Sequence, residues 1–211
     1  MRPVRVLGGF FLRFLVVFVL VMAPWPVVGD VYAAFFRAGG NLLFSSFGSE
    51  GRVQFRRLSD REPPHAAEDT DMILVNRRTR AESVFSAGSR QQGYKPTAFV
   101  LALILATPIP WARRLRAALW GLLCVNVYVA FRVAVLLAGA FSGNNKLALF
   151  TPGPVAGFVL DYIGWVVVAS YAGWLILPLG IWVLVTFRLR DWNALFRIDE
   201  RVQHTGESVT C

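Results

Sequence analysis

Residues 117–141 read AALWGLLCVNVYVAFRVAVLLAGAF, and this apolar stretch decides the class of fold that the sequence predicts. Its polar interruptions are Asn126 and Arg132. A helix needs roughly 20 apolar residues to cross a hydrocarbon layer of ~30 Å, and this stretch is long enough. The sequence therefore predicts a membrane-spanning helix at this position.

Three further apolar stretches, at 8–28, 97–111 and 155–187, extend this prediction along the chain. They favour an all-α integral membrane protein with about four transmembrane helices and a small β-containing extracytoplasmic insertion. Whether the first span is cleaved as a signal peptide stays open, because its basic start and apolar run fit both readings. The predicted units are 1–29 (cytoplasmic N-terminus and first span), 30–93 (extracytoplasmic segment), 94–187 (membrane core with spans at 94–111, 115–141 and 155–187) and 188–211 (cytoplasmic tail).

The composition argues against a soluble enzyme and against a nucleic-acid partner. Charged residues make up 17% of the 211 residues, whereas soluble domains carry about 25%. The net charge of +9 comes largely from arginines beside the apolar stretches, where they can contact anionic lipid heads. The positive-inside rule then predicts a multi-pass protein of the bacterial inner membrane, with both termini cytoplasmic and membrane lipids as partners. The arginine clusters are Arg2, Arg5 and Arg13; Arg113, Arg114 and Arg116; and Arg188, Arg190, Arg197 and Arg201.

The polar block between the first two apolar stretches predicts a small antiparallel sheet. Residues 52–56 alternate polar and apolar side chains, which is the period of a half-buried strand, and 72–75 and 83–86 are further strand candidates. Segments 32–36 and 42–44 are typical of a helix lying on the membrane surface. About three strands with so few large apolar side chains cannot build a deep core of their own.

Two ionisable residues, Arg132 and Asp161, fall inside predicted spans, where a charge costs roughly 3 kcal/mol. The two helices run in opposite directions from one outer loop, so the side chains can lie at similar depth. Either they form a buried ion pair, or Arg132 faces an outward cavity and binds a carbonyl, carboxylate or phosphate. Asn126 could reach the floor of such a cavity or hydrogen-bond a neighbouring helix.

Covalent catalysis and metal binding have little support in the sequence. Nucleophilic catalysis needs a thiol or hydroxyl beside a base, and the cysteines and histidines fall in separate predicted regions (Cys124, Cys211, His65 and His204). The acids near His65 (Glu68, Asp69 and Asp71) show no spacing that fixes a ligand geometry. We therefore predict no catalytic residue, no metal and no cofactor.

The segments Tyr94–Pro96, Ala106–Arg114 and Asn126–Val133 together resemble the core of the exosortase/archaeosortase family of membrane transpeptidases. The shared features are an apolar helix ending in a Pro-x-Pro-Trp turn, a basic loop and an Asn…Arg helix. The resemblance implies a cysteine nucleophile before the first of these helices, where this chain has Gln91 or Gln92. It matches the family's arginine to Arg132.

A further basic residue that the resemblance places near the start of the last helix is also missing, since only Asp161 and Tyr162 stand there. The resemblance thus implies a non-catalytic, exosortase-like or exosortase-associated protein that assists the sorting of exported proteins at the outer membrane face. Its partner would be an exosortase-like enzyme or an exported protein with a C-terminal sorting tail. The candidate binding residues are Arg132, Asp161, Asn126, Gln91 and Tyr162.

Two alternatives stay open. One is a membrane enzyme of the protease or transpeptidase kind that uses another nucleophile, such as Ser86 or Ser89 with Arg90 beside it. The other is a lipid- or glycan-binding membrane subunit, which would suit a site open to the outside.

Overall fold

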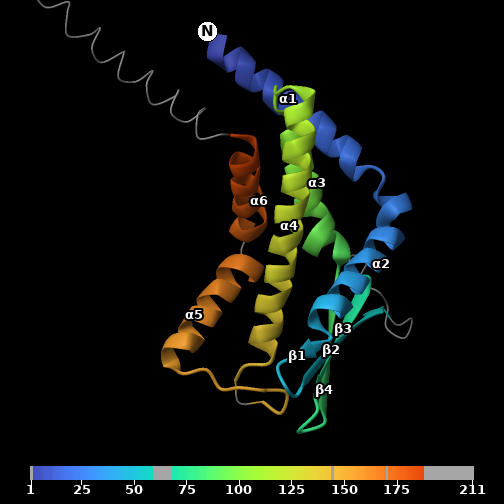
Figure 1. Cartoon of the computed structure of the whole chain (residues 1–211), viewed down its shortest axis with the longest axis vertical. Coiled ribbons are helices and arrows are strands. Elements are labelled where there is room, and N and C mark those ends of the chain that lie inside the picture. Colours follow the sequence, from blue (N-terminus) through green and yellow to red (C-terminus); the bar gives the residue numbers. More distant parts are fainter. Residues whose placement is uncertain (1, 59–67, 144, 170, 188–211) are drawn as a thin grey trace, which may run out of the picture.

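The computed structural model describes residues 2–58, 68–143, 145–169 and 171–187. It is a bundle of helices with a small sheet at one end, and helix α2 lies across that sheet (Figure 1). The predicted tail at 188–211, residues 59–67 of the predicted extracytoplasmic segment, and the side chains of His65 and His204 lie outside the described residues. The elements are α1 (Arg2–Met22), α2 (Trp25–Phe44), β1 (Ser46–Phe47), β2 (Gly51–Arg57), β3 (Thr70–Asn76), β4 (Ala81–Ala87), the π-helix η1 (Arg90–Tyr94), α3 (Lys95–Ala106), α4 (Trp111–Ala140), α5 (Pro154–Gly164), the π-helix η2 (Trp165–Ala169) and α6 (Tyr171–Thr186).

Prolines set several of the helix boundaries. Pro24 stands between α1 and α2, whose axes bend by 71° at this break. Pro108 and Pro110 separate α3 from α4. Proline lacks a backbone N–H and its ring clashes with the preceding turn, so it is tolerated at a helix start but ends a helix that reaches it. The chain is therefore cut into more and shorter helices than its apolar stretches suggest.

The prediction of an all-α protein with four membrane spans is wrong. By length and composition one described helix, α4, can cross a membrane, or two spans are possible if the bent pair α1–α2 counts as one. The predicted second span contains α3, whose 12 residues reach only about 18 Å at 1.5 Å per residue. The predicted fourth span is divided by η2 into two shorter helices. The described fold is instead a helical body with a four-stranded antiparallel sheet.

The three strands that the sequence predicted are present, and a two-residue strand, β1, precedes them. The order is β1-β2-β3-β4, with every neighbouring pair antiparallel. The register places Val53 opposite Leu74 and Met72 opposite Phe85. Buried and more exposed positions alternate along β2 and β3, so the apolar side chains share one face of the sheet.

That apolar face packs on the helices rather than on a second sheet. The buried cluster combines strand residues with residues of α2 and of the second half of α4. The ring of Phe36 of α2 meets the ring of Phe55 edge-on, with 6.1 Å between the ring centres. Phe47 of β1 stacks on Phe141 with 5.2 Å between the ring centres. The members are Phe36, Val53, Phe55, Met72, Leu74, Ala87, Val129, Val133, Leu137, Phe141 and Leu147.

A second cluster holds the other half of the helical body together. It consists of Val100, Ile104, Ala117 and Val125, with partly buried residues of α6 packed against it. Gly121 permits this packing, because a Cβ there would lie 2.7 Å from the Ile104 side chain. Helix α4 takes part in both clusters and so connects the sheet to the bundle.

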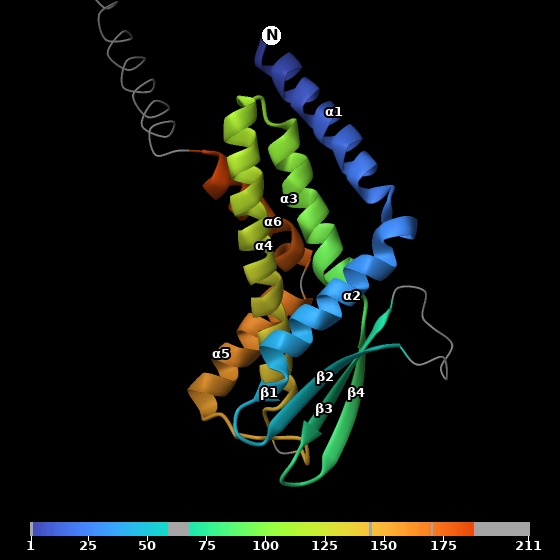
Figure 2. The same ribbon diagram turned by 45° about the vertical axis from the view of Figure 1, so that its right-hand side comes forward.

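The two edges of the sheet differ. On one edge, β1 pairs with Gly51 and Arg52 of β2. Beyond β1, the Asn41 side chain of α2 donates to the Phe55 carbonyl of β2 (2.9 Å) and accepts from the Phe55 N–H (2.8 Å), as a neighbouring strand would. On the other edge, β3 is the only described element with which β4 makes extensive contact. The edge of β4 lies on the outside of the molecule (Figure 2).

The Asn41 contact gives the first prediction. Replacing Asn41 by alanine leaves two backbone groups of Phe55 without partners, so the free energy of unfolding should fall by about 2 kcal/mol. The exposed Asn126, whose side chain bonds within its own helix, is the matched control, and Asn126→Ala should change the free energy of unfolding by less than about 0.5 kcal/mol. Denaturant unfolding in mild detergent, followed by tryptophan fluorescence, measures both. Equal losses in the two variants would contradict the role of Asn41.

Candidate functional site

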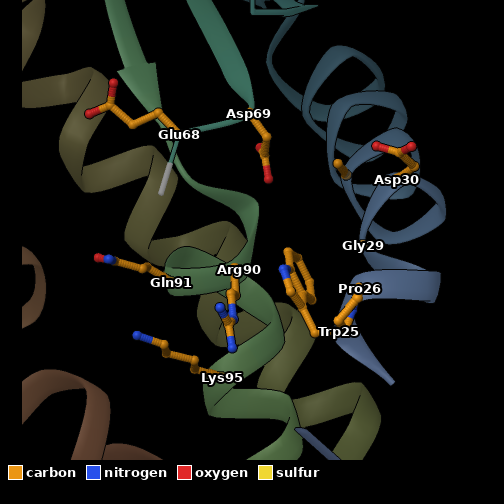
Figure 3. A pocket seen from close by; sticks show the side chains of 10 residues that line it. Trp25, Pro26, Gly29, Asp30, Glu68, Asp69, Arg90, Gln91 and Lys95 are labelled. Carbon is orange, nitrogen blue, oxygen red and sulfur yellow. The ribbon is translucent and has the colours of Figure 1, made fainter. Parts of the chain in front are cut away.

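A polar cavity of about 300 Å³ lies where the break between α1 and α2 meets η1 and the residues that lead into β3. Figure 3 shows its side chains, with Arg90, Gln91 and Lys95 on one side, Asp30 on another and Glu68 and Asp69 above. Of the residues predicted for a site, it contains Gln91. The lining residues are Trp25, Pro26, Gly29, Asp30, Ala33, Glu68, Asp69, Arg90, Gln91 and Lys95.

The π-helix η1 brings the two cations of the cavity together. The backbone N–H of Lys95 donates to the carbonyl of Arg90, five residues earlier. In an α-helix, positions five apart stand about 140° apart around the axis, whereas the wider turn closed by an i→i+5 hydrogen bond brings them closer together around the axis. Pro96 has no N–H for the carbonyl four residues earlier, which interrupts the α-helical pattern here. Both Arg90 and Lys95 therefore line the same cavity.

The three carboxylates of the cavity differ in how they are bonded. Asp69 accepts from the backbone N–H of Ser89 (3.0 Å) and from its hydroxyl (2.6 Å), so it holds the start of η1 in place. Asp30 and Glu68 form no ion pair with Arg90 or Lys95 in the part of the chain that the structure describes. Opposite charges thus face one cavity without neutralising each other directly.

Aromatic side chains fix the walls of the cavity. The Trp25 ring lies 4.7 Å from that of Tyr94, and the Arg90 guanidinium lies 5.4 Å from the centre of the Trp25 ring. The Tyr94 hydroxyl donates to the carbonyl of Val21 at the end of α1. Burial raises the pKa of Tyr94, against a smaller opposing effect of Arg90, so the phenol keeps the proton that it donates. These contacts tie α1, α2 and η1 to one another.

The two serines considered as nucleophiles have different surroundings. Ser89 is fully buried and donates to Asp69, so no substrate carbonyl can reach its hydroxyl. Ser86 is exposed on β4, and its hydroxyl donates to a carboxylate oxygen of Asp71 at 3.2 Å. Among the described residues, no group of three histidine, cysteine or acidic side chains is placed to hold a metal ion.

Arg132 is buried on α4 with an exposed fraction of 9%. One of its terminal nitrogens donates to the carbonyl of Val168 in η2 (3.1 Å), and its Nε has no hydrogen-bond partner. Within the described residues it forms no ion pair with Asp161, which is exposed on α5. Tyr162 is exposed beside it and stacks on Phe158 at 6.3 Å. The structure therefore does not bring Arg132, Asp161 and Gln91 together in one cavity.

Asn126 lines a separate, mainly apolar groove of about 170 Å³ between α2 and α4. Its side-chain nitrogen donates to the Leu122 carbonyl of its own helix (2.7 Å) rather than to a neighbouring helix. The glycines Gly39 and Gly40 form part of the opposite wall. Asn126 thus borders an apolar surface and stands apart from the charged cavity.

Sequence reasoning missed most of the charged cavity. Asp30, Glu68 and Lys95 come from three distant parts of the chain, and Arg90 and Lys95 are five residues apart, a spacing that no α-helical pattern places on one face. Pro96, six residues after Arg90, was the available signal, because a proline at this point favours an irregular turn. No protein-family model, curated protein or solved structure matches the chain.

The position of Arg132 gives the second prediction. Arg132→Ala should lower the free energy of unfolding by about 2 kcal/mol, because the Val168 carbonyl loses its donor. Asp161→Ala, at an exposed position, should change it by less than about 0.5 kcal/mol. The change in the free energy of unfolding of the double variant should then equal the sum of the two single changes within about 0.5 kcal/mol, as for residues that do not interact. A coupling energy above about 1 kcal/mol in this double-mutant cycle would show that the two residues do pair.

Proposed function

We propose that this protein is a non-catalytic, membrane-embedded subunit that binds an exported polypeptide at the outer face of a bacterial inner membrane. The resemblance to exosortases suggests the setting. The observation that carries the proposal is the open edge of β4. The opposite side of the sheet is covered, because Asn41 of α2 bonds to the backbone of β2. The polypeptide would add to the sheet as a further strand next to β4.

The exposed apolar surface supports the membrane location. Val19 and Leu20 on α1, and Leu119 and Val127 on α4, each expose more than half of their side chains. Similar residues continue along α2, α5 and α6, including Val31, Phe35, Leu42, Phe158 and Ile176. A soluble monomer rarely exposes apolar patches of more than a few hundred Å². Lipid would cover these side chains.

The open edge supports polypeptide binding because exposed strand edges present unpaired backbone groups. Proteins normally protect such edges with charges, prolines, bulges or a covering element. Here α2 protects one edge through Asn41. The seven residues of β4 contain no proline and no lysine or arginine, and Val84 is 54% exposed at their centre. An extended segment that pairs with β4 would gain backbone hydrogen bonds, and neighbouring side chains would select its sequence.

The position that the resemblance assigns to the nucleophile supports a binding role rather than catalysis. Gln91 stands there, in a cavity without a thiol. Cys124, the cysteine among the described residues, lies on α4 and does not line that cavity. Ser89 is closed off from substrate, which weakens the alternative of a serine enzyme. An amide side chain can hydrogen-bond a ligand but cannot form a thioester.

Photo-cross-linking in native membranes tests the proposed edge and gives the third prediction. A photoreactive phenylalanine at Val84 should form adducts with an exported protein, identified by mass spectrometry. The same group at Arg52 is the control, since Arg52 lies on the same outer face, two strands away on β2 and two residues along, about 12 Å from Val84. Equal adducts from both positions, or none with any polypeptide from Val84, would contradict the proposal.

A charged substitution provides the fourth prediction. For this test the photoreactive phenylalanine replaces Glu82 of β4. Val84→Lys should then lower the yield of the cross-link by at least about tenfold, because a lysine on an edge strand opposes strand pairing. The variant should unfold like the wild type, since Val84 is exposed. Gln54→Lys, which adds the same charge in the same cross-strand row but two strands away from the edge, should leave that yield unaltered. Loss of the adduct in both variants would point to general electrostatics instead.

A further inference from the structure

We propose that the segment received by β4 carries two adjacent apolar residues and, two positions from one of them, a lysine or arginine. One apolar side chain covers Val84 on the outer face of the sheet, the other covers Phe85 on the inner face, and the basic residue faces Glu82. The inference rests on the proposed function and deepens it, since it names the kind of segment that the edge selects. It follows from the cross-strand rows that end at β4.

On the inner face, an apolar row runs across the sheet and ends at the edge. Side chains that lie opposite one another on neighbouring strands form such rows, and a row continues into any strand that is added. This row consists of Phe55, Met72 and Phe85. Phe55 and Met72 each expose 3% of their surface, whereas Phe85 exposes 40%. The row is therefore apolar throughout but covered only on its first two strands.

The exposure of Phe85 comes from its place at the edge. Phe85 lies on the face that packs on α2 and α4, because it is opposite Met72. Among the described elements, only β3 makes extensive contact with β4, which leaves one side of the Phe85 ring open. A strand added beside β4 places a side chain next to that ring. An apolar side chain there removes apolar surface from water on both partners.

The outer face presents a second apolar position at the same edge. Val84 follows Gln54 and Ile73 in its row and is 54% exposed. The residue added opposite Val84 is the neighbour in sequence of the residue added opposite Phe85, and neighbours in a strand point to opposite faces. The two apolar residues of the segment are therefore adjacent, and together they cover the edge from both faces.

Glu82 supplies the charge that the segment matches. It is exposed on the outer face two residues before Val84, and it forms no ion pair within the described part of the chain. The arginine in its own row, Arg52, is two strands away, about 10 Å. A cation on an added strand would lie about 5 Å from Glu82, whereas an acid there would be repelled. A lysine or arginine is therefore favoured two positions from the residue that covers Val84.

Peptide binding to the full chain in mild detergent, measured by fluorescence anisotropy, tests the pattern. The probe is a threonine-rich peptide with the core Lys-Thr-Val-Phe, or with the reversed core if that peptide binds more tightly, because a strand can add in either direction. Replacing its valine and phenylalanine by threonine, which also favours strands, should weaken binding by about tenfold, since each apolar cross-strand pair contributes up to about fivefold. Replacing its lysine by glutamate should weaken binding by about fivefold.

Variants of the chain separate recognition from a general loss of folding. Glu82→Lys should reverse the preference, so that the glutamate peptide binds more tightly than the lysine peptide. Glu50→Lys, in the turn before β2, makes the same change of charge two strands away and should keep the wild-type preference. Phe85→Thr should abolish the preference for phenylalanine over threonine in the peptide. Phe150→Thr, at a phenylalanine that is 42% exposed before α5, is its control and should leave that preference unaltered. Circular dichroism checks that each variant is folded.

Several outcomes would overturn the pattern. Equal binding of the core peptide and the threonine peptide would show that β4 pairs with any extended segment. An unaltered charge preference in Glu82→Lys would show that Glu82 does not select the segment. Binding of no peptide, with adducts from Val84 that link two copies of this chain, would show that the edge pairs with itself. The first two outcomes leave the proposed function intact, whereas the absence of adducts with an exported polypeptide from Val84 contradicts the proposed function itself.

Discussion

The packing of the sheet's apolar face against α2 and the second half of α4 is the constraint on which the rest of the structure depends. The four short strands have no second sheet to cover them in the described chain, so Val53, Phe55 and Leu74 are buried in one cluster with Phe36 of α2 and with Val133 and Leu137 of α4. The side-chain period of a strand is two, so a shift of one residue would turn these side chains to the outside. The same contact therefore fixes the register and the place of β4.

This constraint also determines where the charged cavity forms. The sheet anchors β4, the chain turns directly from β4 into η1, and Asp69 ties the first residues of that turn to the start of β3. The bend at Pro24 then directs α2 back across the sheet, which brings Asp30 to the opposite wall. The cavity is thus the meeting point of three segments, each held by a contact outside it.

The sequence predicted the parts of this fold that depend on local patterns. Strand β2 could be predicted because polar and apolar side chains alternate along it, and this period of two is visible in adjacent residues of the sequence. The membrane spans could not be predicted in this way, because a count of apolar residues does not reveal the breaks at Pro24 and in η2. Gln91 was identified through its place in a motif, but its neighbours Asp30 and Glu68 were not. Their meeting depends on a bend and a π-turn that no pattern of single residues encodes.

Arg132 shows how a costly group can be accommodated without a ligand. An unpaired cation inside a helical body would be strongly destabilising, and an acidic partner would be the usual remedy. Here the guanidinium donates instead to Val168, within the π-helical segment where the hydrogen-bond register of the last helix changes. The contact joins α4 to the point where the last apolar stretch is divided. This places Arg132 in the architecture of the bundle, apart from the edge of β4 and from the cavity that Gln91 lines.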